Sequence, residues 1–378
     1  MSRIFIIAGE ASGDVLGARL ISALRAQRQD LEFSGIGGPR MAEAGVSSLF
    51  PMQELALMGL AEILPKIFAL KARLRQTVET IKSGRPDIVV TIDSPGFCLR
   101  VLRAIADTGI ARIHYVAPQV WAWRQSRVKH FPGLWDELLC LLPFEPDFFA
   151  PHGLNPVFVG HPVLESGADT GSASRFLAAH SLASNAVPVV LMPGSRITET
   201  QRLLPVFRDT IAHLAPKIRG LQPVLAAAPV IADAILTNTA DWPVQPIIVR
   251  DVAERYDAFA AAHAALTKSG TSTLELAMAG VPMAVTYRVN PLSAALARRM
   301  IKVKHVAMIN LLAGHALVPE LLQQNCSAEK LSATLETLLT DPAAAVTQRA
   351  GYTKALASLH APQSTPSAAA AARILARL

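Results

Sequence analysis

Short apolar runs that alternate with longer helical stretches constrain the fold of this chain more than any other feature. In the first half, these runs cover residues 4–8, 32–36, 88–92, 112–116, 137–142 and 157–159. Several lack polar alternation, which is typical of strands that helices cover on both faces. Helical segments such as 15–27 and 99–106 lie between them. The sequence therefore predicts consecutive βαβ units and a parallel sheet.

The alternation restarts in the second half, with strands expected at 189–192, 224–227, 247–249, 264–267 and 283–287. Residues 166–187, between the halves, are rich in serine and glycine and indicate a hinge. We therefore predict an α/β fold of two Rossmann-like, doubly wound parallel-sheet domains, residues 1–165 and 188–345, that face a cleft. Helices over 346–378 would pack back on the first domain or on a partner chain. Ligands of such domains bind at the carboxyl ends of the strands.

Composition narrows the classes of partner. The chain has 378 residues, of which 51% are hydrophobic, and a formal net charge of +7. A basic surface attracts nucleic acid, anionic lipid or phosphorylated substrates. The sequence has no RNA-binding aromatic motif, zinc-finger spacing or long basic arm, so nucleic acid is disfavoured. No uninterrupted apolar run reaches the ~18 residues that a membrane-spanning helix needs.

The cysteines indicate the redox compartment. Cys98, Cys140 and Cys326 are far apart and odd in number. This spacing disfavours a disulfide framework and a structural zinc site, and it fits a reducing cytosol.

Two acidic residues follow predicted strands of the first domain. Glu10 ends the first strand, in the run Gly9-Glu10-Ala11-Ser12-Gly13-Asp14, and Asp93 ends the strand at 88–92. The strand-end rule places both at the ligand site, where a carboxylate can accept a proton from a sugar hydroxyl. The alternative for Asp93 is a turn-forming role before Ser-Pro. Ser12 or Asp14 is expected to cap the helix that follows Glu10.

A third first-domain motif carries two of the four tryptophans, in residues 114–124. For Trp121 and Arg124 in this motif, two interpretations are equally good: a platform on which a sugar stacks, and packing between domains. The dinucleotide fingerprint GxGxxG and the G-x-S-x-G elbow are both missing, which disfavours a dehydrogenase and an α/β-hydrolase.

Two strand-to-helix turns of the second domain have the composition of a phosphate site. In the first turn, the backbone amides of Gly194 and Ser195 and the guanidinium of Arg196 can hold a phosphate at a helix start. The second turn, residues 268–275, repeats this design with Ser269, Gly270 and Thr271 before a helix that carries Glu275. There the carboxylate can accept hydrogen bonds from both ribose hydroxyls. Two such turns in one domain favour a nucleotide-diphosphate pocket.

No Asp-x-Asp motif is present to hold a metal ion. We therefore expect no metal and no cofactor, with helix dipoles and an arginine stabilising a departing diphosphate.

Residues 54–75 carry more apolar surface than one buried stripe requires, and the segment ends with the basic residues Lys71, Arg73 and Arg75. A core helix and a surface element that dips into lipid are equally good interpretations. In the second interpretation, the lipid contacts are Met58, Leu60, Ile63, Leu64 and Phe68.

Together these motifs resemble the lipid-A-disaccharide synthase family over nearly the whole chain. The matching pieces are Ala8-Gly9-Glu10-Ala11-Ser12-Gly13-Asp14, Gly38-Pro39-Arg40-Met41, Leu57-Met58-Gly59, Ile92-Asp93-Ser94-Pro95, His114-Tyr115-Val116, Val120-Trp121-Ala122-Trp123-Arg124, Leu142-Pro143-Phe144-Glu145, Gly160-His161-Pro162, Pro193-Gly194-Ser195-Arg196, Ser269-Gly270-Thr271, Leu274-Glu275 and Asn310-Leu311-Leu312-Ala313-Gly314.

The resemblance implies a GT-B fold and an inverting hexosyl transfer in lipopolysaccharide synthesis. UDP-2,3-diacylglucosamine would be the donor and the 6-hydroxyl of 2,3-diacylglucosamine 1-phosphate the attacking group. The products would be the β-1,6-linked lipid A disaccharide 1-phosphate and UDP. The enzyme would be cytoplasmic, peripheral on the inner membrane, and a homodimer through its carboxyl-terminal part. Arg196, Glu275 and Asn310 would lie in or near the donor pocket.

One departure from the family pattern affects the general base. The family run Ile-Asp-x-Pro-Asp-Phe-Asn is here Ile92-Asp93-Ser94-Pro95-Gly96-Phe97-Cys98, so glycine replaces the second aspartate. The base candidates are then Asp93 first, Glu10 second and His114 third. Two other functions stay open at this point: a UDP-N-acetylglucosamine 2-epimerase and an inactive nucleotide-sugar-binding scaffold.

Overall fold

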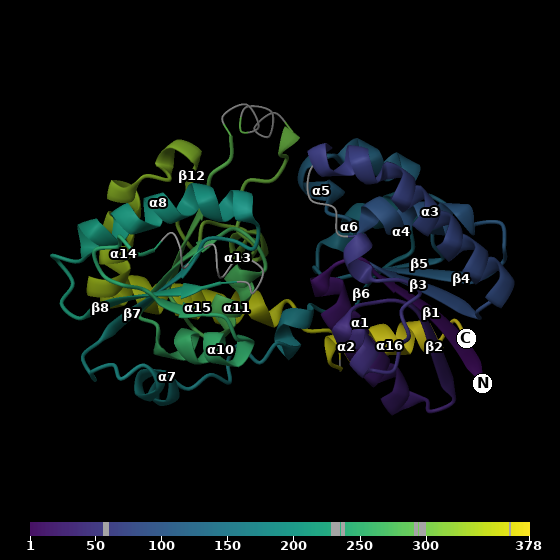
Figure 1. The fold of residues 1–378 in the computed structure, drawn as a ribbon, viewed down its shortest axis with the longest axis horizontal. Coiled ribbons are helices and arrows are strands. Elements are labelled where there is room, and N and C mark those ends of the chain that lie inside the picture. Colours follow the sequence, from purple (N-terminus) through teal and green to yellow (C-terminus); the bar gives the residue numbers. More distant parts are fainter. Residues whose placement is uncertain (56–59, 228–234, 236–238, 291–293, 295–299, 363) are drawn as a thin grey trace. The chain divides into compact units, whose positions relative to one another are not determined.

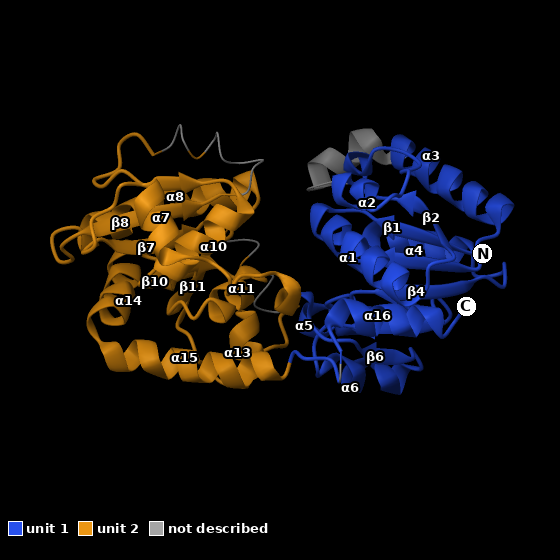
Figure 2. Cartoon of the chain, turned by 90° about the horizontal axis from the view of Figure 1, so that it is seen from below, with its two compact units in different colours: residues 1–162, 359–378 blue, residues 163–358 orange. Residues whose placement is uncertain are grey.

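The computed structural model describes residues 1–55, 60–227, 235, 239–290, 294, 300–362 and 364–378, and of residues 60–67 only the helical backbone. The described chain forms two compact units (Figure 2). Unit 1 comprises residues 1–162 and 359–378, and unit 2 comprises residues 163–358. The chain thus passes between the units at 162–163 and again at 358–359.

Unit 1 is built on a six-stranded parallel sheet with the order β2-β1-β3-β4-β5-β6. The strands are β1 (Ser2–Ala8), β2 (Leu31–Ile36), β3 (Ile88–Ile92), β4 (Ala111–Tyr115), β5 (Glu137–Cys140) and β6 (Pro156–Phe158). Each predicted strand of this half is present, with bounds that differ by two residues or fewer.

Helices bury both faces of the unit 1 sheet, as its uniformly apolar strands require. Ile4 and Ile6 point to one face, against α1 (Ala11–Gln27), α2 (Pro39–Glu43) and α16 (Pro366–Leu375). Phe5 and Ile7 point to the other, against α3 (Leu60–Gly84) and α4 (Pro95–Ala104). Full burial of each such side chain stabilises the fold by roughly 1.5–3 kcal/mol. The shorter helical elements of this unit are η1 (Met52–Glu54), α5 (Val120–Trp123), η2 (Gln125–His130), α6 (Glu145–Phe149) and η3 (Ala150–His152).

The last helix, α16, belongs to unit 1 although it lies at the end of the chain. It packs beside α1 (Figure 1). Arg373 and Arg377 of this region both pair with Glu137, whose side chain is only 1% exposed. The preceding helix α15 (Pro342–Ala357) instead packs on α13 (Met308–Ala313) and α11 (Ser272–Met278) of unit 2. The residues expected as one C-terminal element are therefore shared between the two units.

Unit 2 repeats the architecture with the sheet order β12-β11-β10-β7-β8-β9, again all parallel. Its strands are β7 (Val187–Met192), β8 (Leu221–Ala226), β9 (Ile247–Val249), β10 (Ala264–Lys268), β11 (Met283–Tyr287) and β12 (Glu320–Leu322). Its helices are η4 (Pro162–Glu165), α7 (Ala173–Ala179), α8 (Ile197–Leu214), α10 (Val252–Ala261), α11 (Ser272–Met278), α13 (Met308–Ala313), η6 (Gln323–Asn325), α14 (Ala328–Thr340) and α15. Strand β12 escaped prediction because three residues carry too little pattern to be recognised.

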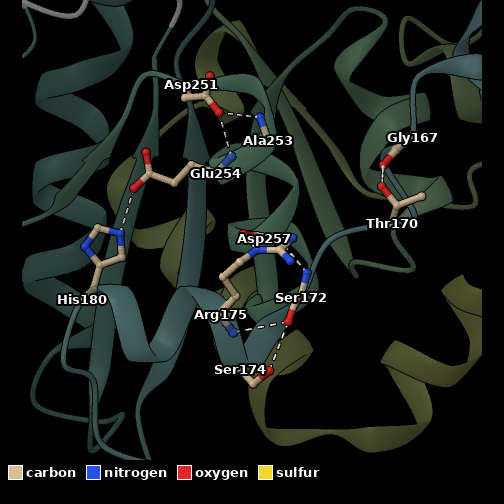
Figure 3. A network of polar contacts seen from close by, with 10 residues as sticks. All are labelled: Gly167, Thr170, Ser172, Ser174, Arg175, His180, Asp251, Ala253, Glu254 and Asp257. Atoms are coloured by element: carbon tan, nitrogen blue, oxygen red, sulfur yellow. Dashed lines mark hydrogen bonds and ion pairs between the residues drawn. The ribbon is translucent and has the colours of Figure 1, made fainter.

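The segment expected as a hinge is fastened to unit 2 by a polar network (Figure 3). Arg175 of α7 makes two charge-assisted hydrogen bonds to Asp257 of α10, whose other contact is the backbone amide of Ser172 at 2.7 Å. The Arg175 guanidinium holds the pKa of Asp257 below its ordinary value. One turn away, His180 lies 2.9 Å from Glu254. These contacts order residues 172–180 against α10.

One local expectation was wrong. Neither Ser12 nor Asp14 caps α1, whose N-cap residue Glu10 makes no side-chain capping bond. Asp14 is 3% exposed and accepts hydrogen bonds from the backbone amides of Gly38, Arg40 and Met41 at 2.8–3.0 Å. Its carboxylate therefore satisfies the free amides at the start of α2. Because these amides begin 24 residues further along the chain, local sequence does not reveal the contact.

Each sheet has one topological switch point, where successive crossovers depart in opposite directions. In unit 1 it lies between β1 and β3, and in unit 2 between β7 and β10. Ligands of open parallel sheets bind at the carboxyl ends of the strands at such points. Among the described residues, no helix is both long and apolar enough to cross a membrane.

Candidate active site

The switch point of unit 2 carries a pocket of about 220 Å³. It lies where the ends of β7 and β10 meet the first turn of α11. The pocket is lined by Met192, Gly194, Ser195, Ala226, Arg255, Lys268, Ser269, Gly270, Thr271, Ser272 and Glu275. The structure thus brings together both predicted phosphate turns and Glu275. Arg255 and Lys268 line the pocket although they were not predicted as site residues.

Gly194 is at this turn for a steric reason. Its φ is +117°, and a Cβ added there would lie 2.6 Å from Oε2 of Glu199. Any side chain would therefore be strained and would displace the Glu199 carboxylate. The glycine lets the backbone approach that carboxylate closely at the start of α8.

A buried carboxylate, Glu199, organises the cations of this pocket. Its Oε1 lies 3.1 Å from Nζ of Lys268 and 3.1 Å from Nη1 of Arg196, and its side chain is 9% exposed. Burial raises the pKa of Glu199, but Lys268 and Arg196 together outweigh it, so the pKa lies below its ordinary value. Oε2 of Glu199 has no hydrogen-bond partner among the described residues. The cluster Glu199–Lys268–Arg196 keeps one net positive charge beside the phosphate turns.

Arg196 stands next to the pocket rather than in its lining. It is the N-cap residue of α8 and its side chain is half exposed. In this structure its guanidinium is directed to Glu199. An anion in the pocket would have to draw Arg196 toward itself, whereas Lys268 already lines the pocket.

Glu275, which also lines the pocket, is held by its neighbours. Its Oε1 accepts hydrogen bonds from Nη2 of Arg255 at 3.2 Å and from the hydroxyl of Tyr256 at 3.1 Å. The guanidinium of Arg255 also lies over the ring of Tyr256. Both recorded bonds use one carboxylate oxygen, so the other is available for ligand hydroxyls.

Asn310 lies in the core and not in the pocket lining. Its side chain is fully buried, and its amide bonds to the carbonyl and amide of Val318 and to Glu320. Glu320 also accepts hydrogen bonds from the backbone amides of Val306 and Ala307, and Ser269 donates to the Val306 carbonyl at 2.6 Å. In this structure Asn310 therefore supports the loop that Ser269 touches, and a donor contact of Asn310 stays a prediction.

The switch point of unit 1 brings the two predicted carboxylates together. Glu10 follows β1 and Asp93 follows β3, neighbouring strands of the sheet. A Cβ added at Gly9 would lie 2.4 Å from Oγ of Ser94, so the two loops touch. Burial is the main cause that raises the pKa of the Cys98 thiol, and the charges of Asp93 and Glu10 raise it further. Both carboxylates therefore lie within electrostatic range of one sulfur atom.

Asp93 occupies a strained loop. It and Ser94 have φ values of 49° and 45°, two consecutive non-glycine residues in the left-handed region. Each such residue costs of order 1–3 kcal/mol and persists where the surrounding structure enforces it, often at functional sites. Burial raises the pKa of the Asp93 carboxyl, against a hydrogen bond from the Ser94 amide that lowers it. A raised pKa suits a residue that must take up a proton.

His114, the third candidate for the base, is excluded by its position. It is fully buried within β4, stacks on Trp135 with ring centroids 5.3 Å apart, and its Nδ1 lies 2.7 Å from Thr91 Oγ1. Burial lowers its pKa to about 3. The imidazole is therefore a neutral core group.

The predicted sugar contacts differ in their exposure. Ser12 lies exposed in the first turn of α1, and Arg124 is exposed with its guanidinium over the ring of Trp123. Trp121 is only 6% exposed and donates a hydrogen bond from Nε1 to Glu145 at 3.1 Å. Trp121 is therefore packed into unit 1, and Trp123 has the exposed ring of this motif.

The predicted lipid contacts are only partly described. Met58 lies outside the described residues, as do the side chains of Leu60, Ile63 and Leu64. Phe68, on the same helix, is 79% exposed. Further along α3, partly buried Leu70 and Leu74 pack against the core. The helix therefore combines a core face with an aromatic residue in solvent.

A model of the lipid-A-disaccharide synthetase family matches residues 4–375. The chain belongs to this family. It is 59% identical to the lipid-A-disaccharide synthase of Granulibacter bethesdensis over 98% of both chains. Members of this family are glycosyltransferases of lipid A biosynthesis. Membership therefore decides against the two alternatives left open by the sequence, a UDP-N-acetylglucosamine 2-epimerase and an inactive nucleotide-sugar-binding scaffold.

Solved structures of lower identity show the fold. The MurG structure from Acinetobacter baumannii is 15% identical, with a TM-score of 0.57 over 99% of both chains. A UDP-GlcNAc 2-epimerase from Neisseria meningitidis, in a structure bound to UDP-GlcNAc, is 12% identical with a TM-score of 0.62 over 100% of this chain and 98% of the other. The fold is GT-B, as predicted, and glycosyltransferases and epimerases share it.

Proposed function

We propose that this lipid-A-disaccharide synthase transfers 2,3-diacylglucosamine from UDP to the 6-hydroxyl of 2,3-diacylglucosamine 1-phosphate, with inversion. The observation that carries the proposal is the pair of switch points: one holds a cationic pocket with two phosphate turns, and the other holds two carboxylates. A nucleotide-sugar transfer needs a site for the diphosphate and a base for the attacking hydroxyl. The pocket of unit 2 meets the first need, and the carboxylates of unit 1 meet the second.

In the donor half, the backbone amides of Gly194, Ser195 and the turn 269–271 bind the diphosphate, together with Lys268 and Arg196. Amides at helix starts and fixed cations stabilise the negative charge that develops on the leaving diphosphate. Glu275, fixed by Arg255 and Tyr256, accepts hydrogen bonds from the ribose hydroxyls. No metal ion takes part in this scheme.

In the acceptor half, Asp93 removes the proton of the 6-hydroxyl as that oxygen attacks the anomeric carbon. The new carbon–oxygen bond forms on the face opposite the diphosphate, the bond from the anomeric carbon to the phosphate oxygen breaks, and UDP leaves. The proton remains on Asp93 until solvent removes it. Glu10 is the second candidate for this role, and the exposed side chains of Ser12 and Arg124 contact the sugar.

We further propose a peripheral attachment to the cytoplasmic face of the inner membrane and a homodimer. Exposed Phe68 on α3 supports the first, since both substrates carry acyl chains. The family resemblance alone supports the second, and sedimentation of the purified chain tests it.

The deciding experiment measures products rather than binding. The purified chain is supplied with acylated donor and acceptor, and UDP and the disaccharide 1-phosphate are quantified by mass spectrometry. We expect both products in equal amounts, an absolute need for acceptor, and full activity in EDTA. Release of UDP without acceptor, or conversion of UDP-N-acetylglucosamine to its 2-epimer, would refute the transfer. Complete loss of activity in EDTA, reversed by magnesium, would refute the metal-free diphosphate site.

A further inference from the structure

Unit 1 contains a second cavity, of about 550 Å³, that none of the predicted roles uses. We call it the arginine pocket. It is lined by Pro95, Gly96, Leu99, Arg100, Arg103, Arg127, His130 and Phe131. Four of these side chains carry cationic or protonatable nitrogen, and the lining has no carboxylate.

Two elements build the arginine pocket. Arg100 and Arg103 lie three residues apart on α4 and therefore share one face of that helix. Arg127 and His130 come from η2, which is joined to α4 by a hydrogen bond from Nη2 of Arg103 to the His130 carbonyl at 3.2 Å. Leu99 and Phe131, which also line the pocket, are buried, at 8% and 3% exposure. The lining therefore combines exposed cationic side chains with buried apolar ones.

These arginines differ from the ion-paired arginines of unit 1. Arg28, Arg73, Arg112 and Arg373, for example, each pair with a carboxylate. Within the described part of the chain, no ion pair is recorded for Arg100, Arg103 or Arg127. Like charges gathered without a counterion repel one another, so an arrangement of this kind is relieved by a bound anion.

The arginine pocket adjoins the loop of the candidate base. Gly96, in its lining, is the second residue of α4 and follows Asp93 by three residues. An anion held here would be part of a substrate whose hydroxyl reaches Asp93. A phosphate monoester has a charge of about −1.5 to −2 at neutral pH, and guanidinium groups bind its oxygens bidentately.

We propose that the arginine pocket binds the phosphate monoester of the acceptor. The inference rests on the proposed function, because it assigns a site to the acceptor of that reaction. Arg100 and Arg127 bind the phosphate from two elements, and Arg103 both binds it and holds η2 against α4.

The first test uses the double variant Arg100→Gln with Arg127→Gln, which keeps Arg103 and its bond to η2. We expect the acceptor KM to rise at least tenfold, with the donor KM and the melting temperature nearly unchanged. The matched control, Lys217→Gln with Lys330→Gln, removes the same charge from exposed positions of unit 2 and should keep the wild-type acceptor KM. An unchanged acceptor KM in the arginine variant, or an equal rise in the control, overturns the proposal.

The second test separates the acceptor from an anionic lipid headgroup as the source of the phosphate. Removing the 1-phosphate from the acceptor should raise KM strongly for the wild type and little for the arginine variant. Binding to vesicles of phosphatidylglycerol should be the same for both proteins. If the variant instead loses vesicle binding and keeps its acceptor KM, the pocket serves a headgroup and the assignment to the acceptor is wrong.

A third measurement does not depend on turnover, so the pocket can be judged even if the proposed transfer fails. Glucosamine 1-phosphate, which is soluble in water, should bind the wild-type chain in a calorimetric titration and should bind the arginine variant at least tenfold more weakly. Equal binding to both overturns the site. Binding that differs, in a chain without transferase activity, retains the phosphate site and rejects only the proposed reaction.

Discussion

The two units share one architecture and treat charge at their switch points differently. In unit 2, carboxylates and cations are paired: Glu199 with Lys268 and Arg196, and Glu275 with Arg255. In unit 1, the carboxylates follow separate strands, and the arginines of α4 and η2 have no recorded carboxylate partner in the described chain. Fixed, paired groups suit a site that stabilises a leaving anion, because its dipoles need little reorganisation. A half-buried carboxylate with a raised pKa, such as Asp93, suits proton transfer.

The difference also concerns the backbone. The turn of unit 2 uses Gly194 where φ is positive, whereas unit 1 places Asp93 and Ser94 in the same left-handed region. Glycine adopts this conformation without strain, but Asp93 and Ser94 do so at a cost in stability. The strain in unit 1 therefore fixes the loop that carries the proposed base, while the glycine in unit 2 provides space.

The largest expected effect is on the base of unit 1. Asp93→Asn should lower kcat by at least ~100-fold and leave the donor affinity nearly unchanged. Asparagine is among the residues that tolerate the left-handed region, so the variant should fold. Burial raises the pKa of Asp93 above that of a free aspartate, so its charged form costs stability at neutral pH, and asparagine removes that cost. Loss of activity would then reflect the missing base.

The pH–rate profile identifies the base. Asp93 acts when deprotonated, so wild-type activity should fall as the pH drops through its raised pKa. This acid limb should lie above pH ~3.9, the pKa of an ordinary aspartate, and should vanish in Asp93→Asn. If the limb persists there and is lost in Glu10→Gln, then Glu10 is the base and Asp93 is a turn residue.

The next effect is on the cations of unit 2. If Arg196 moves from Glu199 to the diphosphate, Arg196→Ala should cost about 1.5–3 kcal/mol, or roughly 10- to 150-fold in donor affinity. Arg208→Ala, on the same helix and also ion-paired at the surface, is the control and should leave donor affinity unchanged. Near-normal donor affinity in Arg196→Ala would mean that Arg196 only neutralises Glu199, and that Lys268 carries the charge of the site.

Sequence reasoning reached the sheets and the phosphate turns for the same physical reason. Strands covered on both faces are uniformly apolar, and the residues that follow them lie at the carboxyl edge of the sheet, so the positions of 194–195 and 269–271 could be predicted without a structure. Pairings between elements could not. The ion pairs of Glu199 with Lys268 and of Arg255 with Glu275 depend on how helices and loops pack. The same holds for the cavity that Arg100 and Arg127 line.

The same limit applies to two predicted site residues that lie buried. Asn310 and Trp121 stand in motifs that resemble the family, but a motif does not reveal which of its side chains point inward. Both are buried, and their hydrogen bonds support neighbouring segments. Lys268 could have been found, since it is the last residue of β10 and directly precedes a phosphate turn.

A smaller effect is expected at the lipid contact of unit 1. Phe68→Ser should weaken binding to phospholipid vesicles by about tenfold, because burial of a phenyl ring in lipid contributes roughly 1.5–3 kcal/mol. The melting temperature should not fall, since Phe68 is 79% exposed. Val252→Ser, at an exposed apolar position of unit 2, is the control. Equal vesicle binding by Phe68→Ser and the wild type would remove α3 from the membrane contact.

The smallest effect is expected where the chain departs from its family pattern. A Cβ added at Gly96 meets no atom within 4 Å, and Gly96 lies in the first turn of α4, so Gly96→Asp should fold. An acidic residue near a helix N-terminus contributes about 0.3–1 kcal/mol, which should raise the melting temperature slightly. The new carboxylate would stand four residues before Arg100, a spacing that favours an ion pair of about 0.2–0.5 kcal/mol. It should therefore compete with the acceptor phosphate and raise the acceptor KM about twofold, without lowering kcat. A rise in kcat together with a second acid limb would show instead that a carboxylate at this position shares the work of the base. In that case, Gly96→Asp should also restore turnover to the Asp93→Asn variant.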